Sequence, residues 1–286
     1  MRSALAATCV VCGADRRRPV LSIQRWEIAA CRGCGTHRLF PEPAGVVLEN
    51  FNDGSGYDGA FGMRDEMLAQ HARSLRALER RVPAGRLLDV GCGPGFLLEA
   101  ARERGWTAVG VDPSPFAVAR ARKGGFEAHG GMLEDVDLAP GSFDALALLQ
   151  VVEHMTDPRP LLAACRRLLR PGGALLVATP NPRSLLARAK GERFNYWIPP
   201  MHCAWYTPRA LVRLLDGNGF RTVRRSTWGA RTEHLHDGRD IVAETALGRR
   251  LPYRAQRALG AAVARAADAL RMGSIVEHIA ARKEDA

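Results

Sequence analysis

The stretch Leu87-Leu88-Asp89-Val90-Gly91-Cys92-Gly93-Pro94-Gly95 decides the fold. Its apolar first half predicts a short buried strand, and its glycines allow the sharp turn that follows. The residues after Phe96 have helical periodicity, so the free N–H groups of a helix would face the same turn. Such a turn also occurs as a purely structural connection. The stretch therefore predicts an α/β fold with a candidate ligand site at the end of its first strand.

The same alternation of strand and helix continues on the C-terminal side of this turn. It predicts a Rossmann-like, doubly wound α/β fold with parallel strands connected by right-handed crossovers. Upstream, Met67, Leu68, His71 and Leu75 share one helix face, on which His71 has a packing or surface role. The last helix should bury a stripe that includes Leu259, Val263 and Leu270. The seven expected strands are 87–90, 107–111, 126–129, 143–149, 174–178, 220–227 and 274–280, and the main helices of the fold are 96–104, 115–122, 160–169, 208–217 and 253–270.

Two acidic residues indicate which ligand this turn would bind. Asp112 ends the second strand, about 20 residues after the glycines, where an acid can accept both hydroxyls of a ribose. Asp89 lies at the end of the first strand, where a carboxylate would repel a dinucleotide pyrophosphate. The pair therefore favours a cationic nucleoside such as a sulfonium amino-acid derivative, and a nicotinamide dehydrogenase is the weaker alternative.

Five segments in order resemble the successive motifs of class I S-adenosylmethionine-dependent methyltransferases, over roughly residues 86–220. They are Leu87 to Gly95, Val111-Asp112-Pro113-Ser114, Ser142-Phe143-Asp144, Glu153-His154, and Leu169-Arg170-Pro171-Gly172-Gly173. The resemblance implies S-adenosylmethionine as the methyl donor. It also implies the donor-binding residues: Asp89, Gly91, Gly93 and Gly95 for the methionine part, Asp112 with Pro113 for the ribose, Met132 and Leu133 for the adenine, and Gln150 beside the methionine end. Many relatives have Asp in place of Met132, so the adenine amino group would be bound by Glu134 or a backbone carbonyl.

Four cysteines near the N-terminus have the spacing of a metal site. Cys9-x2-Cys12 and Cys31-x2-Cys34 are two thiol pairs separated by 18 residues. Two such turns supply the four soft ligands of tetrahedral zinc, so we predict a structural zinc-ribbon-like knuckle; four unrelated thiols are the alternative. Cys92, Cys165 and Cys203 are interpreted as packed thiols.

Part of the N-terminal region resembles the corresponding region of a bacterial methyltransferase subgroup. Cys31 to Pro43 and Tyr57 carry this resemblance. That subgroup is often linked to modification of sugars, polysaccharides or secondary metabolites, which implies an acceptor of this kind.

The segment from Trp197 to Thr207 is the best candidate for the acceptor side. It follows the fifth strand and contains His202, a candidate general base, and Trp197, Trp205 and Tyr206 would form a wall of the acceptor pocket. It resembles the His-x3-aromatic-Thr signature of methyltransferases related to the polyprenyl-quinone O-methyltransferases. A histidine that only orders the loop is the alternative.

Gln150-x2-Glu153-His154 supplies a second candidate, His154, just after the fourth strand. On a helix these three residues would share one face. They resemble the Glu-x2-Glu-His set proposed to hold a divalent cation in quinone O-methyltransferases. Gln150 replaces the first acid of that set, so the alternative is that Glu153 and His154 only hold the helix start and its loops.

Composition limits the remaining choices. The chain has 286 residues and a formal net charge of +11, which suits either an anionic partner or a solvated basic surface. It contains no apolar stretch long enough to span a membrane and no convincing signal peptide, so we expect a cytoplasmic protein that does not bind membranes. The expected domains are a knuckle at 1–40, a helical linker or cap at 41–85 and a methyltransferase domain at 86–286, with acceptor-side insertions or a lid at 180–208 and 229–272.

The functional hypothesis is methyl transfer from S-adenosylmethionine to a small-molecule acceptor, which can be anionic, at a hydroxyl of a sugar or secondary metabolite. The alternative is a ribosomal RNA base methyltransferase with a zinc knuckle. Nucleic acid is the less favoured partner, because Trp26 and Phe40 are the only knuckle aromatics that bases could stack on. A cofactor-binding protein without catalytic activity is a third reading, disfavoured by the intact glycine and acid motifs.

Overall fold

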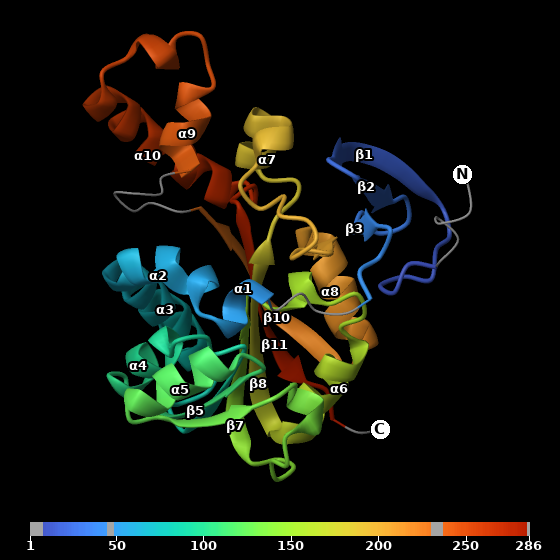
Figure 1. Ribbon diagram of the computed structural model, residues 1–286, viewed down its shortest axis with the longest axis vertical. Coiled ribbons are helices and arrows are strands. Elements are labelled where there is room, and N and C mark those ends of the chain that lie inside the picture. Colours follow the sequence, from blue (N-terminus) through green and yellow to red (C-terminus); the bar gives the residue numbers. More distant parts are fainter. Residues whose placement is uncertain (1–7, 45–48, 230–236, 285–286) are drawn as a thin grey trace.

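The computed structural model describes residues 8–44, 49–229 and 237–284 and contains two sheets (Figure 1). The larger has seven strands in the order β10-β11-β8-β7-β4-β5-β6, which confirms the predicted Rossmann-like α/β fold. Its strands are β4 (Arg86–Val90), β5 (Thr107–Asp112), β6 (Glu127–Gly130), β7 (Phe143–Leu149), β8 (Leu169–Pro180), β10 (Phe220–Trp228) and β11 (Ile275–Arg282).

One strand differs from the predicted parallel arrangement. β11 is antiparallel to both of its neighbours, β8 and β10. The segment between β10 and β11 begins and ends on the side of the sheet where β10 finishes. Because it does not cross back to the side where β10 starts, β11 must run antiparallel to β10. The other six strands are parallel, as predicted.

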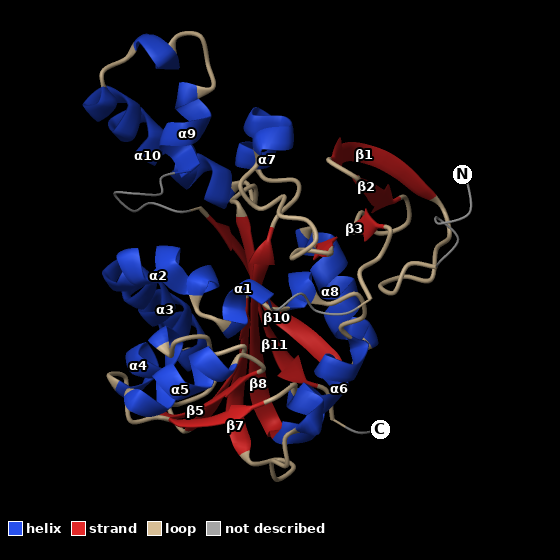
Figure 2. Ribbon diagram, viewed as in Figure 1, coloured by secondary structure: helices blue, strands red, loops and turns tan. Residues whose placement is uncertain are grey.

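Helices cover both faces of this sheet (Figure 2). On one face α3 (Arg64–Glu79) and α4 (Phe96–Arg102) bury Leu75, Leu78 and Leu97 against the sheet. On the other face α6 (Arg159–Leu168) and α8 (Pro208–Gly217) bury their leucines. α5 (Pro115–Lys123) covers β5 and β6. With both faces covered, a central strand such as β7 is apolar at nearly every position, as its sequence indicated.

The smaller sheet joins the N-terminal segment to a distant part of the chain. β1 (Arg17–Ile23), β2 (Trp26–Cys31) and β3 (His37–Phe40) form an antiparallel meander. The two-residue strand β9 (Ala204–Trp205) pairs antiparallel with β3 and completes the order β1-β2-β3-β9. In Figure 1 the blue strands β1–β3 lie beside the yellow chain that leads to α8.

A helical lobe lies beyond one end of the large sheet (Figure 1). It consists of α7 (Leu185–Lys190), α9 (Asp237–Ala243) and α10 (Tyr253–Ala269), and Lys190 Nζ lies 2.9 Å from Asp240 Oδ2 across the α7–α9 contact.

The stripe predicted for the last helix was wrong. Leu259 and Leu270 are 47% and 70% exposed, and the buried positions of α10 are Gly260, Ala264 and Ala267. These small residues lie three or four positions apart, and their lack of bulk allows the close approach of neighbouring backbone.

Within the described residues, no helix is both long and apolar enough to cross a bilayer. The division into domains at 1–40, 41–85 and 86–286 stays a prediction, as does the lid role of 180–208 and 229–272. Part of the latter segment, 230–236, lies outside the described residues.

Candidate active site

A cavity of about 630 Å³ opens at the carboxyl ends of β4, β5 and β7. This is within the range of small-molecule sites, and the carboxyl end of a doubly wound sheet is where such folds bind their ligands. The glycine turn and the first residues after β5 line one part of it. The rest is lined by the helices before β4, by the loop at 196–202 and by the paired ends of β10 and β11.

The glycine turn has the backbone that its sequence indicated. Gly91, Gly93 and Gly95 all have positive φ, at 72°, 51° and 95°. A Cβ on Gly91 would lie 2.7 Å from Cγ2 of Val151, so this position excludes any larger residue. The turn therefore exposes backbone, rather than side chains, to a ligand in the cavity.

Asp112 is fixed by backbone donors on both of its oxygens. The N–H of Gly93 donates to Oδ2 and the N–H of Ser114 donates to Oδ1, each at 2.8 Å. Ser114 also caps α5, because its hydroxyl accepts the N–H of Ala117 at 3.2 Å. Burial raises the pKa of Asp112 despite these two bonds, which lower it.

Asp89 lies beside Asp112 in the cavity wall and is only 3% exposed. Burial and the nearby charge of Asp112 raise the pKa of Asp89 to about 8. Two acids lining a buried cavity favour a ligand with positive charge, which would lower both pKa values again.

The cavity is also lined by Pro113, Met132, Leu133 and Gln150. Eight of the nine predicted donor-site residues therefore line one cavity, and the ninth, Gly95, lies at the start of α4. Gln150 corrects the sequence interpretation, which put Gln150, Glu153 and His154 on one helix face. Gln150 has a left-handed backbone (φ 59°), and only the short turn at Val152–His154 is helical. Its N–H donates to the carbonyl of Ala178 at 2.8 Å, so the chain stays tied to β8 there.

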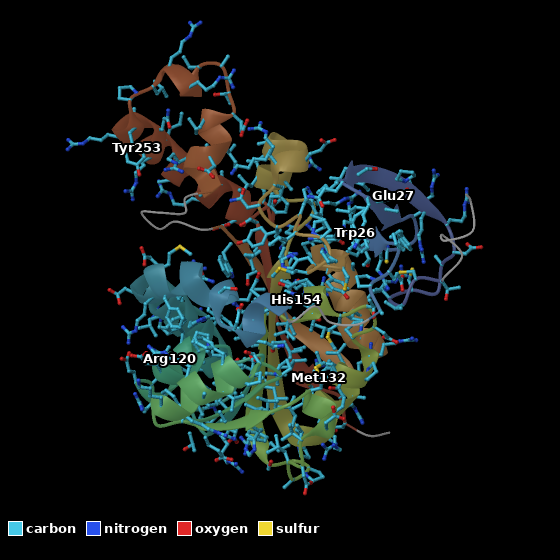
Figure 3. The ribbon with its side chains drawn as sticks, in the orientation of Figure 1. Trp26, Glu27, Arg120, Met132, His154 and Tyr253 are labelled. Atoms are coloured by element: carbon cyan, nitrogen blue, oxygen red, sulfur yellow. The ribbon has the colours of Figure 1, made fainter. Side chains whose placement is uncertain are left out.

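His154 and His202 meet at the cavity wall, although 47 residues separate them in the chain. Their ring centroids lie 4.8 Å apart, edge to face. Nδ1 of His154 donates to the carbonyl of Met201 at 2.9 Å, and Nδ1 of His202 donates to the carbonyl of Tyr196 at 3.0 Å. Because a carbonyl only accepts, Nδ1 carries the proton in each neutral ring. Figure 3 places His154 centrally, far from Tyr253 in the helical lobe.

Burial keeps both rings neutral. Burial and the neighbouring His154 lower the pKa of His202 to about 3, and burial lowers the pKa of His154. At neutral pH the Nε2 lone pair of His202 is therefore available to accept a hydrogen bond or a proton.

Glu153 is buried next to this histidine pair. The hydroxyl of Thr179 donates to Oε2 of Glu153 at 2.9 Å, whereas Oε1 is buried without a hydrogen-bond partner. Burial raises the pKa of Glu153 to about 8. One potential ligand atom each from Glu153, His154 and His202 lie within 4.8 Å of one another, a donor set typical of divalent metal sites.

The aromatic residues expected to wall the acceptor pocket do not line it. Trp205 and Tyr206 are fully buried behind the loop, and Trp197 packs on Trp205 with ring centroids 4.9 Å apart. The residues of this loop that line the cavity are Tyr196, Ile198, Met201 and His202. These aromatic side chains therefore lie behind the wall. Trp197 and Trp205 pack toward the smaller sheet, and Tyr206 packs in the core of the large sheet.

Sequence reasoning missed the contribution of the helices before β4. α1 (Glu49–Asn52), α2 (Asp58–Gly62) and α3 cover the cavity, and Phe51, Tyr57, Met63 and Met67 line it. The apolar face of the helix containing Met67 was visible in the sequence, but the segment was interpreted only as a helical linker or cap, without a contribution to the cavity.

His71, on α3, also lines the cavity. Its side chain is buried, its Nδ1 has no hydrogen-bond partner, and burial lowers its pKa to about 4. Trp228 and Ile275, at the paired ends of β10 and β11, complete the wall beyond it.

The four N-terminal cysteines come together as their spacing predicted. Sγ of Cys9 lies 3.6 Å from that of Cys34, and Sγ of Cys12 lies 3.6 Å from that of Cys31. Zinc–sulfur bonds of about 2.3 Å in a regular tetrahedron place sulfurs about 3.8 Å apart. The cluster therefore has the geometry of a zinc knuckle. Cys92, Cys165 and Cys203 are buried free thiols, as interpreted.

Comparison with known proteins identifies this arrangement. A family model described as a methyltransferase domain matches residues 63–225, more than half of the chain. The chain belongs to this methyltransferase family. The match spans the glycine turn, Asp112, both histidines and the cavity-lining part of α3.

Two curated relatives of the methyltransferase are bacterial proteins named ubiquinone biosynthesis O-methyltransferase. The one from Dinoroseobacter shibae is 34% identical over 170 residues, covering 55% of this chain and 68% of the relative. The one from Xylella fastidiosa is 35% identical over 193 residues, covering 58% and 77%.

Solved structures share the fold at lower identity. A SAM-dependent methyltransferase from Thermotoga maritima, described as a possible histamine N-methyltransferase, superposes with a TM-score of 0.59 at 18% identity and covers 83% of this chain and all of its own. A SAM-dependent methyltransferase from Archaeoglobus fulgidus gives 0.56 at 22% identity, covering 79% of this chain and all of its own. The chain is a methyltransferase that uses S-adenosylmethionine.

Proposed function

We propose that this methyltransferase transfers a methyl group to a hydroxyl of a small, largely apolar acceptor. The observation that carries the proposal is the histidine pair, which lines the same cavity as the donor turn. The acceptor end of that cavity is lined mainly by apolar side chains, among them Met67, Ile198, Met201 and Trp228. Relatives named O-methyltransferases of ubiquinone biosynthesis also support transfer to oxygen.

The lining favours an uncharged, flat acceptor such as a phenol or catechol over a sugar or an anion. A sugar would bury several hydroxyls, each of which costs free energy without a hydrogen-bond partner. No Lys or Arg is found among the described residues that line the cavity, so nothing there would compensate an anionic acceptor. A secondary metabolite with an aromatic hydroxyl remains within the proposal.

In the proposed reaction S-adenosylmethionine would supply an electrophilic methyl group. The acceptor oxygen would bond to that carbon as the carbon–sulfur bond breaks, and S-adenosylhomocysteine would leave as a neutral thioether. Asp89, Asp112 and the backbone of Gly91 and Gly93 would hold the donor in the same cavity as the acceptor. Nε2 of His202 accepts the hydrogen bond of the acceptor hydroxyl and takes its proton as the oxygen–carbon bond forms. Because its pKa is lowered to about 3, His202 is a weak base in the empty cavity, so this step requires a hydroxyl already made acidic by an aromatic ring.

A divalent cation is the alternative way to activate the hydroxyl. The donor set fits, because Oε1 of Glu153 is buried without a partner close to His154 and His202. A cation held by these three residues would lower the pKa of a nearby hydroxyl. In that case His202 would be a metal ligand rather than a base, and chelation of the purified protein separates the two roles.

Ribosomal RNA is the less favoured acceptor. The two knuckle aromatics on which bases could stack are buried, since Trp26 is 8% and Phe40 4% exposed. An RNA methyltransferase would show strongly salt-dependent RNA binding, and we expect none of measurable specificity.

We further propose that Cys9, Cys12, Cys31 and Cys34 bind one structural Zn²⁺. The supporting observation is the spacing of their sulfurs, and four thiolates leave no open position for catalysis.

The deciding experiment offers the purified protein labelled S-adenosylmethionine with two probes, a 4-alkylcatechol and an alkyl glucoside of the same chain length. We expect an O-methylated catechol by mass spectrometry and no methylated glucoside. His202→Gln should lower kcat on the catechol by about 100-fold while leaving affinity for S-adenosylhomocysteine unchanged. Methylation of the glucoside alone, or full activity of His202→Gln, would refute the acceptor class or the base.

A further inference from the structure

The knuckle sheet has an edge that is paired with the active-site loop. His37 lies opposite Trp205 and Arg38 opposite Ala204 in the β3–β9 ladder, and the N–H of Leu39 donates to the carbonyl of Cys203 at 3.0 Å. β9 begins two residues after His202, so the position of β3 determines where the chain leaves the cavity wall.

One carbonyl links this ladder to the candidate base. The carbonyl of Tyr196 accepts from Nε1 of Trp205 at 2.8 Å and from Nδ1 of His202 at 3.0 Å. Trp205 is fully buried and takes its place from the β3–β9 pairing. A shift of β9 would therefore displace Trp205, and with it the acceptor that orients the His202 ring.

The loop and the knuckle also share one apolar core. Trp26, Ile28 and Leu39 of the knuckle pack with Cys203 and Trp205 of the loop. The ring of Trp197 stacks on that of His37 with centroids 6.1 Å apart. Neither segment can bury these side chains without the other, so their order is coupled.

The cysteines control the strand that makes this contact. Cys31 ends β2 and Cys34 lies three residues before β3, so a metal bound to both fixes the turn between the two strands. Backbone bonds tighten the same turn, because the N–H of Gly35 donates to the carbonyl of Cys31 at 2.9 Å. From outside the turn, Nη1 of Arg213 on α8 donates to the carbonyl of Gly33 at 3.2 Å.

The donor half of the cavity is built without the knuckle. Among the described residues, no hydrogen bond or ion pair joins 8–40 to the turn at 89–95 or to Asp112. The carboxylate of Asp112 accepts from Gly93 in that turn and from Ser114 at the start of α5. Order in the knuckle can therefore change without changing the donor site.

We propose that the four-cysteine knuckle is a positioning element of the acceptor site, in which metal binding fixes β3, and through β9 sets the position of Trp205 and His202. The proposal rests on the proposed zinc site. It makes the knuckle a support behind the wall that holds the acceptor, rather than a separate binding module.

The test uses the full chain labelled with 5-fluorotryptophan, whose five ¹⁹F resonances are assigned by single Trp→Phe variants. Removing zinc with a chelator should shift or broaden the signals of Trp26, Trp197 and Trp205, and added zinc should restore them. The signal of Trp106, which packs in a cluster that contains no residue of the 196–205 loop, is the internal control and should not move. Affinity for S-adenosylhomocysteine should stay within about twofold.

Leu39→Pro provides a test that leaves all four cysteines in place. Proline removes the N–H that Leu39 directs to β9 but keeps its carbonyl. We expect zinc content and donor affinity to be retained and the Trp205 signal to shift. The fold increase in KM for the catechol probe should be about ten times the fold decrease in kcat.

The outcomes of these tests distinguish failure of the positioning role, of the zinc site and of the proposed acceptor. Unmoved Trp197 and Trp205 signals after zinc removal, or an unchanged Trp205 signal in Leu39→Pro, would overturn the proposal. Loss of donor affinity in parallel with the signals would also overturn it, because the knuckle would then support the whole fold. A protein that contains no zinc as purified would refute the zinc site, whereas absent turnover of a protein that binds both zinc and donor would refute only the proposed acceptor.

Discussion

Replacing Asp112 by alanine should abolish most of the affinity for the methyl donor. Its carboxylate is 5% exposed, borders the cavity and is held by two backbone N–H groups at 2.8 Å. A carboxylate fixed in this way can accept both ribose hydroxyls. Hydrogen bonds to a charged group contribute about 1.5–3 kcal/mol each, so losing two removes at least about 3 kcal/mol. The dissociation constant should then rise about 150-fold.

Isothermal titration calorimetry with S-adenosylhomocysteine measures this change directly, without an acceptor. Asp112→Ala also leaves the N–H groups of Gly93 and Ser114 without a partner, which costs about 1–3 kcal/mol of stability each. The titration must therefore be made at a temperature at which circular dichroism shows the variant folded. Asp65→Ala is the matched control, since the side chain of Asp65 is 92% exposed and should leave affinity unchanged.

An affinity of folded Asp112→Ala within about threefold of the wild type would refute the reasoning. The carboxylate would then serve only to hold the turn at Gly93 and the start of α5. Asp112→Asn refines the result, because an amide can satisfy only one of the two backbone donors. Its affinity should lie between those of the wild type and Asp112→Ala.

Four further outcomes follow from the same cavity. The pKa of Asp89 is raised from 3.8 to about 8 in the folded protein, so on raising the pH the unfolded chain loses this proton first. The stability of the ligand-free protein should therefore fall between about pH 4 and about pH 8, and Asp89→Asn should flatten this part of the plot of melting temperature against pH. Donor binding should release a proton from Asp89 below pH 8, seen as buffer-dependent calorimetric heats that are smaller in Asp89→Asn. Gly91→Ala should lower the melting temperature and the donor affinity more than Gly105→Ala does. Both glycines have positive φ, which costs an alanine about 1–2 kcal/mol, but only a Cβ at position 91 would clash with Val151. Equal effects of the two substitutions would show that the clash is relieved. His71→Leu should retain stability, because it removes a buried unpartnered nitrogen, and should raise the KM for the catechol probe about tenfold; an unchanged KM would limit His71 to packing.

Local sequence signals predicted the strands of the large sheet to within two residues at each end, except that β8 begins at Leu169, five residues before the predicted start at Ala174. Phe143 to Leu149 is apolar at nearly every position, which only a strand buried on both faces requires, and β7 has these bounds. Glycines with positive φ ended β4 where the sequence placed the turn. The cysteine spacing likewise predicted a cluster, since each Cys-x2-Cys turn brings its two sulfurs together by itself.

Contacts between distant segments were harder to predict. Gln150 was placed on a helix because its spacing to Glu153 and His154 fits one, but a hydrogen bond to Ala178 of β8 holds its backbone in a left-handed conformation. Leu259 and Leu270 have the periodicity of a buried stripe, yet the close approach of neighbouring helices selected Gly260, Ala264 and Ala267 for the buried face.

The sequence by itself was enough to predict the Rossmann-like fold, the methyl donor and the four-cysteine cluster. Strand and helix periodicity encodes the fold, the resemblance of five ordered motifs implied the donor, and two Cys-x2-Cys turns indicated the cluster. Only the tertiary structure decided that β11 runs antiparallel, that His71 borders the cavity, and that His154 and His202 face each other. It also decided that β9 completes the knuckle sheet, 164 positions beyond the end of β3 by residue number. Such contacts depend on how whole elements pack, and hydrophobic packing is non-directional, so residue periodicity carries no record of which distant partner is chosen.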